Sequence, residues 1–124
     1  MNTQKIAVIL IHALVGWMLC AATMGIGMAV TSLETTLILH AIGAPIFFFL
    51  VSLVYFRKFN YTTPLQTALI FIACVIGMDI FVVAMLINHS FEMFTSLLGT
   101  WIPFVLIFSS TWLTGILVKS VYHP

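Results

Sequence analysis

Residues 64–88 form a long apolar stretch that contains one acidic side chain, and this combination limits the folds open to the chain. The stretch is long enough to span a bilayer as a helix, for which about 20 residues suffice. Asp79 lies near its middle and is the only acidic residue in any apolar span of the chain. A carboxylate at that depth costs roughly 2.5–3.5 kcal/mol on insertion scales, so we expect it to face protein or water rather than lipid.

Three further apolar stretches accompany this one, and only 6% of the residues are charged. Soluble domains carry about 25% charged residues, so no water-soluble fold could bury this much apolar side chain. The predicted fold is all-α, a polytopic membrane protein whose single domain, residues 1–124, holds four transmembrane helices in an up-down bundle. The spans are expected at residues 6–30, 36–56, 65–88 and 94–118.

The connections between these spans are short, so we expect consecutive spans to pack as antiparallel hairpins. Thr63 and Pro64 together predict the start of the third helix, because a threonine hydroxyl can cap the helix and proline suits its first position.

The few charges divide the chain into two sets. The basic residues lie near the chain ends and in the second connection: Lys5, Arg57, Lys58 and Lys119. The first and third connections carry Glu34 and Glu92 instead. In a four-span chain these sets fall on opposite sides of the membrane. The positive-inside rule then places both the N-terminus and the C-terminus in the cytoplasm.

Asp79 has a functional and a structural interpretation. In the first it is a protonatable or cation-binding carboxyl group on a pathway, with His40 and Thr100 beside that pathway. In the second it is hydrogen-bonded to Thr, Ser or Trp side chains and only packs the bundle. His40 is open in the same way, since it can pair with Asp79 and relay protons or make a plain interhelical hydrogen bond.

A sulfur-rich set offers a weaker metal hypothesis. Cys20 and Met24 lie one turn apart on the first span, and Met78 can approach from the third. Soft sulfur ligands select Cu(I), but methionine is also an ordinary gap-filler in cores. We therefore assign no metal.

The histidines argue against a haem protein. At a rise of about 1.5 Å per residue, His12 and His40 are predicted to lie about 18 Å apart along the membrane normal, too far to bind one iron within a chain. No nucleophile–base constellation supports an enzyme either. The net charge of +1 gives no indication of nucleic-acid binding. We predict no cofactor.

Small residues on the first span predict close helix packing. Ala21 and Gly25 match the small-xxx-small pattern that lets helix backbones approach in membranes. The expected partners are therefore the lipid bilayer and either a second copy of the chain or another membrane subunit.

Two segments carry a family resemblance. His40-Ala-Ile-Gly-Ala-Pro45 and Leu98-Gly-Thr-Trp-Ile-Pro103 resemble parts of small bacterial four-span inner-membrane proteins to which no activity is assigned. The resemblance covers residues 37–115 and implies a bacterial inner (plasma) membrane location. The four-span small multidrug exporters are similar in size, but their acidic residue lies in the first helix, whereas Asp79 lies in the third.

These observations leave three hypotheses for function. The first is a transporter or channel-like protein for protons, cations or small solutes, built around Asp79. The second is a non-catalytic accessory subunit of a larger membrane complex. The third is a protein that binds a metal or cofactor in the membrane.

Overall fold

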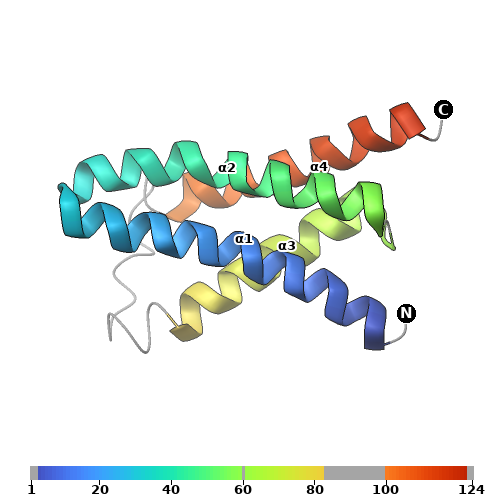
Figure 1. Ribbon diagram of the computed structural model, residues 1–124, viewed down its shortest axis with the longest axis horizontal. Helices are drawn as coiled ribbons and strands as arrows, with labels where there is room; N and C mark the ends of the chain where they lie inside the picture. Colours follow the sequence, from blue (N-terminus) through green and yellow to red (C-terminus); the bar gives the residue numbers. More distant parts are fainter. Residues whose placement is uncertain (1–2, 60, 83–99, 123–124) are drawn as a thin grey trace.

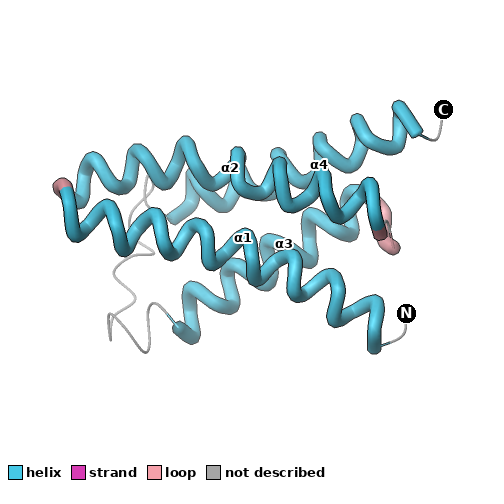
Figure 2. Tube along the Cα trace, viewed as in Figure 1, coloured by secondary structure: helices cyan, strands magenta, loops and turns pink. Residues whose placement is uncertain are grey.

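The computed structural model describes residues 3–59, 61–82 and 100–122. Within these ranges the chain is helical apart from two connections (Figures 1 and 2). The helices are α1 (Thr3–Val30), α2 (Leu33–Lys58), α3 (Pro64–Met78) and α4 (Ile102–Tyr122). The all-α class is therefore confirmed. The predicted end of the third span, the start of the fourth and Glu92 lie outside the described residues.

Three of the helical stretches are long and apolar enough to cross a membrane: α1, α2 and Pro64–Val82. The last of these extends α3 by a π-helical turn over residues 79–82. The apolar part of α4, Ile102–Val118, is shorter. The membrane character of the chain thus rests on three long apolar helices among the described residues.

Hydroxyl caps set the starts of two helices. The Ser32 side chain accepts a hydrogen bond from the Thr35 backbone N–H at 3.2 Å, so α2 begins three residues earlier than predicted. The predicted start at Thr63 and Pro64 is confirmed. The Thr63 hydroxyl accepts from the Gln66 backbone N–H at 3.2 Å, and the Gln66 side chain accepts from the Thr63 backbone N–H at 3.1 Å. Such reciprocal bonds satisfy two donors that a helix start leaves open.

The four helices are packed in the order α1, α2, α4, α3 around the bundle. The chain direction alternates from helix to helix, so α2 and α4 run parallel to one another as neighbours (Figure 1). The hairpin prediction holds for α1 and α2 but is wrong for α2 and α3, which lie diagonally opposite. The five residues 59–63 can span about 17 Å, enough to cross the diagonal of a bundle with helices about 10 Å apart.

Aromatic rings fill the centre where that diagonal is crossed. Phe48 and Tyr55 of α2 both contact the Phe71 ring of α3, with centroids 6.0 Å apart in each case. All three side chains are fully buried. Gly16 of α1 packs directly on the Phe48 ring, since a Cβ atom there would lie 2.5 Å from its tip. α1 therefore needs a glycine at this position.

The charged residues lie at the two ends of the bundle. Lys5 Nζ lies 5.3 Å from the centroid of the Tyr61 ring, which places the start of α1 beside the connection that follows Arg57. The C-terminal end of α4 lies at this same end, whereas Glu34 begins α2 at the other (Figure 1). The predicted separation of basic and acidic groups is thus present. Which end faces the cytoplasm stays a prediction.

Candidate functional site

Asp79 is held by a tryptophan from another helix. The Trp17 indole Nε1–H donates a hydrogen bond of 2.9 Å to Asp79 Oδ1. Trp17 lies midway along α1, so the carboxyl group is fixed near the middle of the bundle. Both side chains are half-buried. The Trp partner considered in the structural interpretation of Asp79 is therefore observed, although its position could not be read from the sequence.

The path of α3 explains how this contact forms. α3 crosses α1 obliquely, and its C-terminal end leaves the bundle near Asp79 (Figure 1). The regular helix gives way to the π-helical turn at Asp79 itself. Single π-helical turns occur frequently at functional sites, because the wider turn disturbs the regular backbone hydrogen bonds. Asp79 thus combines an intramembrane carboxyl group with local backbone irregularity.

Cys20 lies one helical turn beyond Trp17 on α1 and is buried. It is close enough to Asp79 for the carboxylate charge to act on its thiol. Met24 and Met78 are half-buried, and Met78 directly precedes Asp79. Among the described residues no three His, Cys, Asp or Glu side chains are grouped to hold a metal ion. The Cys20–Met24–Met78 set stays a prediction.

His40 and Asp79 are not hydrogen-bonded in the described part of the chain. His40 Nδ1 is buried and has no hydrogen-bond partner there. Phe48 marks the level of Trp17, because it packs on the neighbouring Gly16. His40 precedes Phe48 by eight residues, about 12 Å along α2. The predicted pairing with Asp79 is therefore not seen.

Thr100, the third predicted pathway residue, is buried immediately before α4. Its interaction partners do not include Asp79 among the hydrogen bonds observed for the carboxyl group, whose partner is Trp17. The structure thus places Asp79, His40 and Thr100 in the bundle without joining them in one hydrogen-bonded cluster within the described residues.

His12 lies at the basic end of the bundle. Its Nδ1–H donates to the Val8 carbonyl at 2.7 Å, and its ring packs edge-on against Tyr55 with centroids 5.5 Å apart. Tyr55 follows His40 by 15 residues, about 22 Å along α2. The two imidazoles are therefore too far apart to ligate one iron within a chain.

A buried hydroxyl cluster near His12 was not anticipated from the sequence. Tyr55 Oη and Thr62 Oγ1 share a hydrogen bond of 2.7 Å, and Thr62 Oγ1 lies 2.5 Å from Thr67 Oγ1. The Tyr61 backbone N–H also donates to Tyr55 Oη, at 3.2 Å. The available signal was the Thr62-Thr63-Pro64 sequence after a tyrosine near a helix end. This cluster fastens the α2–α3 connection to the core.

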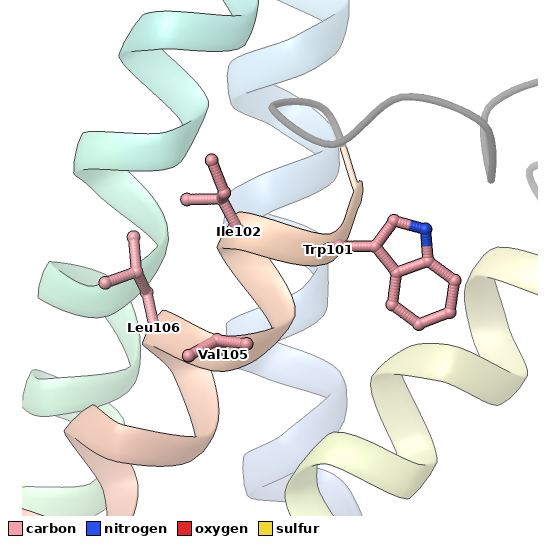
Figure 3. Close-up of a pocket in the computed structure, with 4 residues that line it drawn as sticks. All are labelled: Trp101, Ile102, Val105 and Leu106. Carbon is pink, nitrogen blue, oxygen red and sulfur yellow. The ribbon is translucent and has the colours of Figure 1, made fainter.

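A surface hollow on the first turns of α4 is the pocket that the described residues outline (Figure 3). It measures about 210 Å³ and is lined by Trp101, Ile102, Val105 and Leu106. Its lining is entirely apolar, and Val105 is largely exposed. The hollow offers nothing that would bind an ion or a polar solute. It does not extend the site at Asp79.

The chain was compared with known protein families, curated proteins and solved structures, and none of the three comparisons found a match. The proposals below therefore rest on the geometry of this chain alone.

Proposed function

We propose that this protein is a small membrane transporter or channel-like protein for protons, cations or small solutes, with Asp79 as its central polar group. The observation that carries the proposal is the Asp79 carboxyl group, which lies at mid-bundle and is held by Trp17 at 2.9 Å. Ionisable groups inside membranes are costly and generally mark substrate or ion pathways. The π-helical turn at Asp79 adds a second feature common at functional sites.

The proposed membrane arrangement has four spans, with α4 as the fourth and both termini in the cytoplasm of a bacterial inner membrane. It is supported by the basic residues at one end of the bundle and Glu34 at the other. Cytoplasmic loops carry an excess of Lys and Arg, so the end that holds Lys5 and Arg57 is assigned to the cytoplasm.

The hydrogen bond from Trp17 defines what the carboxyl group can do. An indole N–H only donates, so Trp17 occupies one acceptor position on Oδ1 and takes no proton from Asp79. The remaining lone pairs of the carboxylate stay available for a proton or a cation. Trp17 is in this account a positioning residue, which orients the carboxyl group and does not exchange protons itself.

Flux measurements in proteoliposomes test the proposal. Proton, monovalent-cation and small-solute flux is measured for the unaltered chain, for Asp79→Asn and for Glu34→Gln. The asparagine keeps the size of Asp79 and its acceptor for Trp17 but cannot titrate. We expect Asp79→Asn to abolish flux and Glu34→Gln, which removes an exposed acid at the bundle end, to retain it. Unchanged flux in Asp79→Asn contradicts the proposal.

A tryptophan variant separates positioning from packing. Trp17→Phe keeps an aromatic side chain but removes the Nε1–H that donates to Asp79. We expect about a tenfold loss of flux, because net hydrogen bonds to charged groups contribute roughly 1.5 kcal/mol. We also expect an altered pH dependence of the remaining flux. A Trp17→Phe protein with the original pH profile would show that the hydrogen bond is only structural.

A non-catalytic subunit of a larger complex is the second candidate, and the outer face of α1 favours it. Gly25 is exposed and nothing lies within 4 Å of the place where its Cβ would be. Ala22 and Ala29 are exposed on the same helix. Small residues on an exposed face allow another helix to approach closely in a membrane.

Purification in mild detergent distinguishes this candidate. A subunit is expected to bring a stoichiometric partner, or a second copy, that Gly25→Leu releases. Ala73→Leu is the control, since Ala73 is exposed on α3 and outside that face. Recovery of the same assembly from Gly25→Leu would exclude α1 as the contact.

A further inference from the structure

Two hydroxyl groups inside the bundle have no hydrogen-bond partner among the described residues: Ser52 Oγ of α2 and Thr111 Oγ1 of α4. Both side chains are 0% exposed. A buried polar group left without a partner lowers the folding equilibrium constant roughly 5- to 150-fold. Two such groups in one small bundle therefore require an explanation.

Both hydroxyls lie in the same helix–helix contact. The Ser110 hydroxyl of α4 donates to the Pro45 carbonyl of α2 at 2.7 Å, which fixes one end of the contact. The Phe56 ring lies 2.7 Å from the place of a Cβ on Gly115, which fixes the other end. Since α2 and α4 run parallel, the residues between these two points line their shared seam (Figure 1).

Ser52 and Thr111 are both in that interval. Ser52 lies one turn before Phe56 on α2, and Thr111 lies one turn before Gly115 on α4. Residues four apart share a helix face, so each hydroxyl-bearing residue faces the seam on the same side as the contact that follows it. The two unpartnered groups thus belong to one buried polar patch rather than to two separate places.

We propose that the α2–α4 seam binds ordered water, held by the hydroxyls of Ser52 and Thr111. Buried waters in proteins typically make about three hydrogen bonds to polar groups that otherwise lack partners. The two hydroxyls supply two of these, and backbone carbonyls of the helices can accept a further one. In a membrane-spanning core such a site places water away from both the lipid and the Trp17–Asp79 contact. The proposal is independent of transport through Asp79.

Water-edited solid-state NMR of the protein in bilayers tests the site directly. With Ser, Thr and Ile side chains labelled, we expect magnetisation to pass from water to Ser52 and Thr111. We also expect it to reach the buried Ile107 methyl group, one turn before Thr111 on the same face. In the double variant Ser52→Ala with Thr111→Val this transfer to Ile107 should disappear. Absence of transfer in the unaltered protein overturns the proposal.

Stability measurements give an independent test with the opposite sign for a dry seam. Ser52→Ala and Thr111→Val each remove a hydroxyl with little change of shape. If water is bound, each variant lowers the folding equilibrium constant about fivefold, because a hydrogen bond is lost. If the seam is dry, each raises it, because an unpartnered polar group is removed. A rise in either variant therefore contradicts the proposal.

A matched variant controls for the loss of a threonine hydroxyl as such. Thr114→Val makes the same change on α4, but that hydroxyl donates to the Ser110 carbonyl of its own helix at 2.6 Å. We expect Thr114→Val to keep the water transfer to Ile107. Loss of transfer in Thr114→Val as well would show that the signal reports loosening of the bundle and would remove its support for the site.

Discussion

Gly16 and Gly25 lie on the same helix, but the structure gives them opposite roles, and this makes an exact comparison possible. A Cβ at position 16 would lie 2.5 Å from the Phe48 ring, whereas at position 25 nothing lies within 4 Å. Ordinary carbon contacts are about 3.5–4.0 Å long, so Gly16→Ala must displace the ring by about 1 Å. Phe48 is fully buried and packed against Phe71, so it has little room to move.

The size of the effect follows from the comparison. Alanine gains up to about 1 kcal/mol of helix propensity over glycine at either position, so this contribution cancels between the two variants. Overpacking of a filled core costs about 1–3 kcal/mol and applies to Gly16→Ala alone. We therefore expect Gly16→Ala to be less stable than Gly25→Ala by about 1–3 kcal/mol.

Reversible unfolding in mixed micelles of mild detergent and dodecyl sulfate measures this difference. Both variants are titrated beside the unaltered chain, at a protein concentration where each is monomeric in detergent. Gly25→Ala should match or exceed the unaltered protein. Equal free energies of unfolding for the two variants would refute the packing of α1 on Phe48 and with it the level assigned to Trp17.

Three further variants test separate contacts. Tyr55→Phe should lower the free energy of unfolding by about 1–3 kcal/mol in micelles, because it leaves a buried donor and Thr62 short of a partner. Ser110→Ala should lower it by about 1 kcal/mol through loss of the bond to the Pro45 carbonyl, and an unchanged value would show that this bond is weak. Thr63→Ala should cost about 1 kcal/mol and speed amide exchange in the first turn of α3.

The sequence predicted the features of this fold that depend on composition and on local signals. Long apolar runs identified the helices, because an all-helical chain is one of the few ways to satisfy backbone groups in lipid. Thr63 and Pro64 identified a helix start because capping is a local interaction. The separation of Lys5 and Arg57 from Glu34 followed from counting spans.

The packing faces could not be predicted in the same way. Soluble helices reveal their buried side through a stripe of apolar residues, but these helices are apolar all round and show no such stripe. Gly16 and Gly25 therefore looked equivalent, although one packs on Phe48 and the other faces outward. The diagonal placement of α2 and α3 was hidden for the same reason, because a short connection alone suggested that they were neighbours.

The site was predicted in part. Asp79 was identified because a carboxyl group is rare in an apolar span, which is a property of composition. Its partner Trp17 was not, since 62 positions separate the two and their contact depends on how steeply α3 crosses α1. His40 was expected nearby from its depth alone, but depth does not fix which way a side chain faces around the helix.

The central claim is that the Asp79 carboxyl group exchanges protons or cations with water inside the membrane-spanning bundle. Infrared difference spectroscopy of the protein in bilayers measures this directly, because the chain has only three acidic side chains and the Asp79→Asn variant identifies the band. We expect a carboxyl band that changes with pH, shifts promptly in D₂O and is missing from Asp79→Asn. A band of Asp79 that responds neither to pH nor to D₂O would contradict the account and leave the carboxyl group as a structural partner of Trp17.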